Sequence, residues 1–222
     1  MEPTARFGDL TVAAFVDRLA SASPVPGGGS AAAITGSLAA SLVAMVASLS
    51  EGKPKYAEHA TLHADALAAG RALSTRFVTL ADEDAAAFDR FGAAMRMPRD
   101  TDVERESRTA AIGHAARGAA EVPYRTIEAC IETVRLAEAL AGRSNRNASS
   151  DLEVSALLAV AAAESAAANV RINLQAIGDD AAARDLAQGT EALIKEIQQL
   201  AARARAAVAS GEPREPLESV RR

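Results

Sequence analysis

Hydrophobic positions along the chain recur every three to four residues, and this spacing predicts a succession of helices. The first begins after Thr11, a residue type that caps helix N-termini. Its apolar face consists of Val12, Phe15, Val16 and Leu19. It ends before Ser23–Gly29, where prolines and glycines interrupt the helical pattern.

The uncharged segment Pro24–Ser50 contains a second predicted helix, from an N-cap at Ser30 to about Ser50. Small residues recur on it every four positions and let neighbouring backbones approach closely, so we expect a core helix surrounded on most sides. Its bulky residues form one stripe: Ile34, Leu38, Leu42, Met45 and Leu49. The segment is long enough to span a bilayer, but its many small and hydroxyl residues and the lack of a flanking basic cluster favour a soluble bundle.

Further breakers divide the middle of the chain. The turn Gly52–Lys55 has its proline at the first position of a long helix that runs to about Met95. Met97–Asp100 ends that helix. Thr101, followed three residues later by Glu104, predicts a capping box that opens the next helix.

Pro123 lies inside this next helical pattern. It predicts a kink or split near Glu121, because proline lacks the amide hydrogen that a helix interior uses. The helix resumes to about Ala141. The remaining segments are a polar loop, a helix, a turn and a last helix: Gly142–Ser150, Ser150 or Asp151 to about Ile177, Gly178–Asp180, and about Ala181–Ala209.

No linker or internal repeat divides these segments, so we expect one domain over residues 1–222, with a core of about 10–209 and a tail of 210–222. About a quarter of the chain is alanine, which favours helices and is depleted in strands. The predicted fold is therefore all-α, an alanine-rich antiparallel bundle of five to seven helices. The narrow gaps between such helices place any ligand pocket at helix ends, at a kink or between subunits.

Charge and cysteine content exclude several classes of protein. A net charge of −5 argues against the basic face that a nucleic-acid binder needs. The lone Cys130 has apolar neighbours, which predict a small core residue rather than a nucleophile, and it cannot form an internal disulfide. Met1–Asp9 lacks the apolar run of a secretory signal. We expect a cytoplasmic protein without nucleic-acid or membrane partners.

The three histidines do not predict a metal site. His59 and His63 stand four residues apart, but Ala60 occupies the position where a zinc-protease motif has glutamate. His114 is isolated. Because zinc needs three or four ligands and no others lie nearby in sequence, no metal is expected.

Two polar patterns are candidates for a binding site. The turn Gly27–Ser30 precedes a helix, where free N–H groups and missing side chains favour a closely approaching anionic ligand. A tight turn that needs positive φ explains the same glycines equally well. Ser165, Asn169 and Asn173 form a polar stripe on one face of an apolar helix. Such a stripe is either a satisfied network between helices or the wall of a ligand site.

Four stretches, in this order, carry a family resemblance: Ser23–Ser30, Gly52–Tyr56, Asp84–Pro98 and Asn145–Asn173. Together they resemble the cyclodeaminase/cyclohydrolase family, which includes the C-terminal domain of formiminotransferase-cyclodeaminase and stand-alone bacterial methenyltetrahydrofolate cyclohydrolases. The resemblance covers about Leu10 to Ala209. Its most specific elements are P-x-P-G-G-G-S and N-x-N-x-x-S-D within one chain.

The resemblance implies an all-helical homodimer with a folate site near the interface, lined by both subunits. A tetrahydrofolate derivative is the implied substrate, with no metal and no tightly bound cofactor. The implied reaction is hydrolysis of 5,10-methenyltetrahydrofolate to 10-formyltetrahydrofolate, which a chain without a transferase domain favours. The alternative is a cyclodeaminase that releases ammonia from 5-formiminotetrahydrofolate. An alternative of another class is a non-catalytic helical interaction module, whose polar stripe sets the dimer register.

Within that family, our hypothesis makes Asp151 the acid/base or cation-stabilising carboxylate, with Asp84 as second choice. The predicted substrate-binding residues are Gly27, Gly28, Gly29, Ser30, Lys53, Lys55, Asn145, Asn147, Ser150, Asn169 and Asn173. A lysine would pair with the glutamate carboxylates of folate, and asparagines would hydrogen-bond the pterin or position water. Because aromatic residues make up only 3% of the chain, we expect hydrogen bonds and aliphatic walls to hold the pterin more than stacking.

Overall fold

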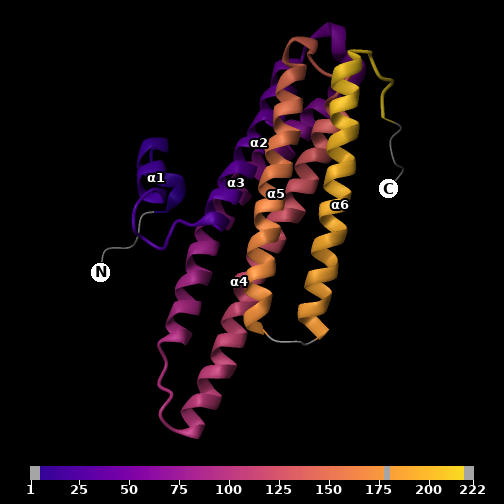
Figure 1. Ribbon diagram of the computed structural model, residues 1–222. Coiled ribbons are helices and arrows are strands. Elements are labelled where there is room, and N and C mark those ends of the chain that lie inside the picture. The colour runs from indigo at the N-terminus through magenta and orange to yellow at the C-terminus, as the bar shows by residue number, and fades with distance from the viewer. Residues whose placement is uncertain (1–5, 178–180, 218–222) are drawn as a thin grey trace.

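The computed structural model describes residues 6–177 and 181–217, and the regular structure within them is entirely helical. Its α-helices are α1 (Val12–Leu19), α2 (Gly28–Ser50), α3 (Ala60–Met95), α4 (Asp102–Leu140), α5 (Ser149–Ile177) and α6 (Ala181–Ser210). Three short 3-10 helices accompany them: η1 (Phe7–Asp9), η2 (Pro54–His59) and η3 (Arg146–Ala148). Helices α2 to α6 lie side by side in one bundle, while α1 stands apart from it (Figure 1). The all-α prediction is confirmed.

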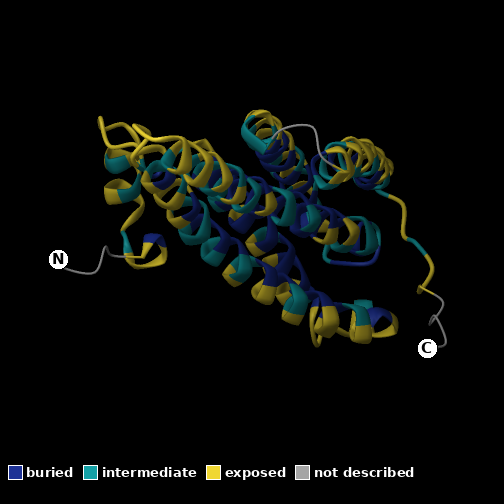
Figure 2. Ribbon diagram, turned by 90° about the horizontal axis from the view of Figure 1, so that it is seen from below, coloured by how far each residue is buried: buried dark blue, intermediate teal, exposed yellow. Residues whose placement is uncertain are grey.

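Small side chains set the spacing between α2 and its neighbours α3 and α5. A Cβ atom placed on Gly36 would lie 2.5 Å from the ring of Phe77, which is fully buried. The hydroxyl of Ser155 on α5 donates to the carbonyl oxygen of Ala39 on α2, at 2.9 Å. Buried positions lie on the sides of the helices that face one another (Figure 2).

The bulky stripe of α2 points the other way. Leu38, Met45 and Leu49 are exposed, with Leu38 at 56%, and the buried positions of this helix are mostly alanine, glycine and serine. The expectation of a helix surrounded on most sides is confirmed apart from this stripe, because α2 packs against α3, α5 and α4. The small-residue faces meet α3 and α5 because close backbone packing excludes large side chains, which remain on the outer face.

Helix α4 is continuous through Pro123, so of the predicted kink or split near Glu121 the split is wrong. Proline at this position leaves the carbonyl oxygen of Ala119, four residues earlier, without its usual helical donor. The side-chain amide of Asn173, on α5, donates to that oxygen at 2.9 Å. A hydrogen bond from a neighbouring helix thus replaces the missing one and removes one cost of the proline.

Most predicted boundaries agree with the structure to within one or two residues. The capping box of Thr101 and Glu104 is formed. Pro54 begins the 3-10 helix η2 instead of the long helix, which starts only at Ala60. The N-cap of α2 is Gly27 rather than the predicted Ser30. Gly28 and Gly29 already lie in the first turn of the helix. The predicted turn at Gly178–Asp180 lies outside the described residues.

The segment after α6 has no regular secondary structure, yet it is held against the bundle. The guanidinium of Arg214 donates to the Glu138 carboxylate and to the Glu138 carbonyl oxygen, each at 2.8 Å. The Arg214 amide donates to the carbonyl oxygen of Gly142, at 3.0 Å. Arg143 in turn donates to the carbonyl oxygen of Glu215. Much of the predicted tail therefore packs over the loop between α4 and α5.

Two helical stretches are long and apolar enough to cross a membrane by length and composition alone, Gly28–Ser50 and Arg146–Ile177. About half of the most apolar part of each is buried inside the bundle, 56% and 44%. Both stretches pack against neighbouring helices along their length. A core helix passes the same test, so these stretches are weak evidence for a membrane span.

The bond from Asn173 to Ala119 predicts a coupling with Pro123. We expect Asn173→Ala to lower the free energy of unfolding by about 1 to 2 kcal/mol, because it leaves a partly buried carbonyl without a donor. In a Pro123→Ala background the restored amide serves that carbonyl, so the same substitution costs less. Urea denaturation of the wild type, both single variants and the double variant measures the coupling. Equal costs in both backgrounds would contradict it.

Candidate functional site

A cavity of about 300 Å³ opens where the first turn of α2 meets the middle of α3 and the C-terminal part of α5. It brings together six of the predicted site residues from three separate segments: Gly27, Gly28, Gly29, Asp84, Asn169 and Asn173. Ser30 lies directly behind Asp84 and hydrogen-bonds to it. The cavity is at a helix end, the kind of place to which an alanine-packed bundle confines a pocket.

The glycine turn is required by close approach rather than by backbone conformation. None of its three glycines has a positive φ, whereas Gly52, Gly142 and Gly211 do. A Cβ atom on Gly29 would lie 2.1 Å from the Asp84 Oδ1 atom, where no side chain fits. The tight-turn explanation is therefore wrong, and the glycine lets a carboxylate sit against the start of α2.

Asp84 is a half-buried carboxylate held at one edge of the cavity. The Ser30 hydroxyl donates to its Oδ2 atom at 2.9 Å. Burial raises the pKa of the Asp84 carboxyl above its ordinary value, while hydrogen bonds from the side chain and backbone of Ser30 lower it. A carboxylate with a raised pKa that remains open to a cavity suits both proton transfer and the stabilisation of a cation.

Asn169 and Asn173 form the opposite wall with their amide nitrogens already engaged. The Asn169 Nδ2 atom donates to the carbonyl oxygen of Ser165, and the Asn173 Nδ2 atom donates to those of Asn169 and Ala119, each at 2.9 Å. Among the residues that the structure describes, no donor binds either amide oxygen. The stripe is therefore a structural network that leaves two acceptors for a ligand.

The other predicted site residues gather at the far end of the bundle. The Asn145 side chain accepts a hydrogen bond from the Asn147 amide at 3.2 Å, and the Asn145 amide donates to the hydroxyl of Ser50 at 2.8 Å. Lys53, Lys55, Asn147 and Ser150 are exposed there. Lys55 also borders a second cavity of about 300 Å³, between η2, the loop after α4 and the end of α6.

Asp151 belongs to this far group and not to the cavity that holds Asp84. It lies in the first turn of α5, eighteen residues before Asn169 on the same helix, which is a separation of about 27 Å. Within one chain, the first-choice carboxylate therefore does not meet the asparagine stripe. The second choice, Asp84, does.

Comparison with known proteins places the chain in a family. The model of the family described as formiminotransferase-cyclodeaminase matches residues 11–192. The chain belongs to the formiminotransferase-cyclodeaminase family. The match extends from the residue that caps α1 into α6, so it includes both groups of predicted site residues.

Individual relatives of this family agree with the assignment. The chain is 38% identical to the methenyltetrahydrofolate cyclohydrolase of Methylorubrum extorquens, over 85% of this chain and 91% of that protein. It is 31% identical to the formimidoyltransferase-cyclodeaminase of Sus scrofa over 85% of its own length, but this spans only 35% of the pig protein. The solved formiminotetrahydrofolate cyclodeaminase of Thermotoga maritima superposes with a TM-score of 0.83 at 25% identity, covering 91% of this chain and 98% of that one.

Two aromatic residues of this family member's cavity were not predicted as part of the site. Phe88 and Phe91, on α3, line it beside Asp84. They are four and seven residues beyond Asp84, a spacing that places all three on one helical face. That spacing was visible in the stretch Asp84–Pro98, so the helical period from Asp84 was the signal that could have found them. The cavity thus offers aromatic rings where aliphatic walls were expected.

The histidines and the cysteine lie outside this cavity. The His63 Nε2 atom is 2.8 Å from the carbonyl oxygen of Arg143, and both His59 and His63 are buried. Cys130 is fully buried, and burial raises the pKa of its thiol, as expected for a core residue. In residues 6–177 and 181–217, no three His, Cys, Asp or Glu side chains cluster closely enough to hold a metal ion.

The hydrogen bond from Ser30 makes the pKa of Asp84 testable. We expect Ser30→Ala to raise that pKa further, because the lost hydroxyl stabilises the ionised carboxylate. Carbon-detected NMR of the side-chain carboxyl groups, followed against pH, measures the shift. Ser165→Ala serves as the control, since the Ser165 hydroxyl bonds only within its own helix in the described contacts. An unchanged Asp84 pKa in Ser30→Ala would refute the role given to this bond.

Proposed function

We propose that this member of the family hydrolyses 5,10-methenyltetrahydrofolate to 10-formyltetrahydrofolate. The observation that carries the proposal is the Asp84 carboxylate, half-buried against the start of α2 and open to a cavity that Asn169 and Asn173 also line. The substrate is an amidinium cation, and a partly desolvated carboxylate stabilises such a charge more strongly than water does. The name of the Methylorubrum extorquens relative supports the choice of reaction.

In the first step, the oxygen of a water molecule bonds to the methenyl carbon between N5 and N10. The Asp84 carboxylate accepts the proton that this water loses. The product of the step is a neutral tetrahedral carbon. Burial raises the pKa of Asp84 toward neutral pH. The ionised carboxylate is therefore a better proton acceptor than that of an ordinary aspartate.

In the second step, the bond from this carbon to N5 breaks. The Asp84 carboxylic acid returns its proton to N5, and the carbinol hydroxyl loses its proton to solvent as the formyl carbonyl forms. One water is consumed and one proton is released. The amide oxygens of Asn169 and Asn173 accept hydrogen bonds from N–H groups of the pterin, and Phe88 and Phe91 pack against its rings.

The cyclodeaminase reaction is the second candidate, because the same cavity suits it and the Thermotoga maritima relative carries that name. There N10 attacks the formimino carbon and loses its proton to the Asp84 carboxylate. Asp84 then passes this proton to the amino group of the tetrahedral carbon, which leaves as ammonia. Both reactions pass through a tetrahedral carbon between N5 and N10. Two assays on the purified protein separate them: loss of the ultraviolet absorbance of methenyltetrahydrofolate above the spontaneous rate, and ammonia release from formiminotetrahydrofolate. If neither assay gives a signal, a non-catalytic interaction module remains as the function.

The central role of Asp84 predicts the effect of neutralising it. We expect Asp84→Asn to lower kcat/KM for methenyltetrahydrofolate by about a hundredfold or more, since it removes both the proton acceptor and the negative charge. Asp89→Asn, at an exposed position of the same helix, is the matched control and should keep wild-type activity. Full activity of a folded Asp84→Asn protein would exclude the mechanism.

We further propose that the protein is a homodimer whose two sites each combine both groups of predicted residues. The exposed stripe of α2 supports this, because Leu38, Met45 and Leu49 present apolar surface along its outer face. On the neighbouring α5, Val154 and Leu157 are exposed as well. A soluble chain gains stability by covering such a surface with a second copy.

The positions of the two groups fit a two-fold arrangement. Gly28–Ser30 begins α2, and the loop of Asn145 is bound to Ser50 at its end. When two α2 helices cross antiparallel near their midpoints, the first turn of one lies opposite the last turn of the other. The partner subunit's Asp151, with its Asn145 loop and lysines, then approaches the cavity that holds Asp84. Asp151 becomes the second carboxylate of a shared site.

A shared site predicts complementation between two inactive proteins. Asp84→Asn and Asp151→Asn should each lose most activity, while a heterodimer of the two carries one fully wild-type site. Co-expression with different affinity tags should therefore restore about a quarter of wild-type activity at random pairing. No recovery in isolated heterodimers would show that both carboxylates act within one chain. Full activity of Asp151→Asn alone would remove it from the mechanism.

The remaining parts of the proposal follow from the chemistry above. Tetrahydrofolate enters as a substrate, and the steps assigned to Asp84 need no tightly bound cofactor. Lys53 and Lys55 are exposed cations at the end of the bundle that the partner's cavity would face, where they pair with the glutamate carboxylates of folate. The low cysteine content and the folate substrate support a cytoplasmic location without membrane or nucleic-acid partners.

A further inference from the structure

Helix α1 is amphipathic but packs poorly on its own chain. None of its residues is buried, and Val12, Val16 and Leu19 are exposed, Val12 at 83%. Its contacts centre on Phe7, whose ring meets that of Phe15 edge-on at 5.7 Å. The helix stands apart from the bundle in Figure 1. A capped helix of two turns with an uncovered apolar face needs a surface to pack against, because short helices are marginal in water.

A groove of about 610 Å³ runs between the C-terminal half of α2 and the facing part of α3. Its apolar lining is Ala44, Met45, Leu49 and Leu67, of which Met45 and Leu49 are well exposed. Ser48 and Arg71 stand at the same groove. The groove is open to solvent, with Met45 and Leu49 exposed at its edge, and within the described chain no helix covers it.

The position of α1 and the position of the groove are related by the proposed two-fold axis. Just before α1, the Phe7 amide donates to the Asp82 carboxylate on α3 at 2.8 Å, which holds α1 on the α3 side of the start of α2. The groove lies on the same side of α2, at its other end. An axis that crosses α2 at right angles within the interface exchanges the two ends and keeps the α3 side in register. It therefore carries α1 of each protomer over the groove of its partner.

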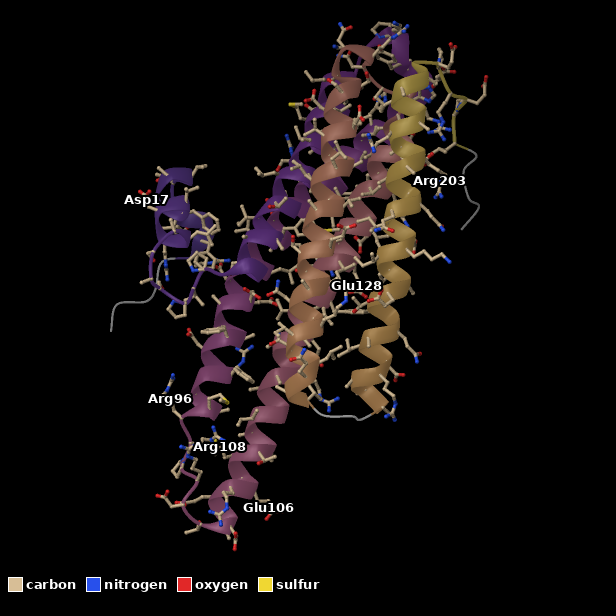
Figure 3. All side chains as sticks on the ribbon, viewed as in Figure 1. Asp17, Arg96, Glu106, Arg108, Glu128 and Arg203 are labelled. Atoms are coloured by element: carbon tan, nitrogen blue, oxygen red, sulfur yellow. The ribbon has the colours of Figure 1, made fainter. Side chains whose placement is uncertain are left out.

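We propose that α1 is an arm that docks its apolar face into the α2–α3 groove of the second copy in the dimer. Charge agrees with this pairing, since α1 carries the exposed Asp17, which points away from its own bundle (Figure 3), and the groove carries the exposed Arg71. The inference rests on the homodimer proposed above, and it adds a contact that the active-site argument does not need. Residues 20–26 connect the arm to the glycine turn, so docking restrains the segment that precedes that turn.

Disulfide cross-linking tests the arm. Val16→Cys on α1 and Ser48→Cys in the groove are introduced separately, and the two singly substituted proteins are co-expressed and oxidised; the native Cys130 of each is fully buried. We expect a covalent heterodimer on a non-reducing gel. Ala14→Cys, exposed on another face of α1, paired with Ser48→Cys is the matched control and should give little product. A Val16→Cys/Ser48→Cys chain that closes only a disulfide within itself, or no disulfide in a confirmed dimer, would overturn the inference.

Exchanging the charges of Asp17 and Arg71 tests the arm a second time, without a covalent cross-link. Asp17→Arg and Arg71→Asp should each raise the dimer dissociation constant by about fivefold, since each affects two symmetric contacts, and combining them should restore the wild-type value. Sedimentation velocity at several concentrations measures all four proteins. Additive weakening in the double variant contradicts the pairing. Catalytic assays are run separately. An active dimer without a docked arm would contradict the arm and leave the shared site in place. A monomeric protein would contradict both the arm and the shared site.

Discussion

The close approach of α2 to α3 is the constraint on which the rest of this structure depends. Gly36 admits the Phe77 ring, and Gly29 admits the Asp84 carboxyl, at places where any Cβ atom would collide. The first contact fixes the distance between the helices, and the second uses that distance to seat a carboxylate against the first turn of α2. Burial there raises the pKa of Asp84, and the hydroxyl of Ser30 limits the rise. The chemistry of the site is therefore a consequence of how tightly two helices pack.

The same packing explains why α2 presents large apolar side chains to the outside. Faces that must pass close to another backbone carry only small residues, so Leu38 and Met45 are left for the outer face. An outward apolar stripe is unfavourable in a monomer and useful in a dimer. The predicted site residues are split between the two ends of one α2, and the antiparallel α2 pair of the proposed dimer would bring the two groups together.

Periodicity and capping signals were sufficient to predict the helices, the capping box at Thr101 and the buried Cys130, since each depends on residues close in sequence. Three features were beyond local reasoning because each depends on contacts between distant segments. Ser30 binds a carboxylate 54 positions away instead of capping its helix. Pro123 leaves α4 intact because an amide on α5 serves the freed carbonyl. The choice of Asp84 over Asp151 for the cavity required knowing which helix ends meet.

Asn173 shows why the two explanations of the polar stripe do not exclude each other. Its amide nitrogen binds backbone oxygens on α4 and α5, and this fixes the plane of the side chain and turns its oxygen to the cavity wall. An unanchored amide would lose rotamer entropy on binding a ligand, whereas this one has already lost it on folding. In a bundle filled with alanine, few polar groups are available to orient one another. The carbonyl released by Pro123 supplies an acceptor for that purpose, so a proline that interrupts the bonding of one helix helps to orient an amide side chain on the next.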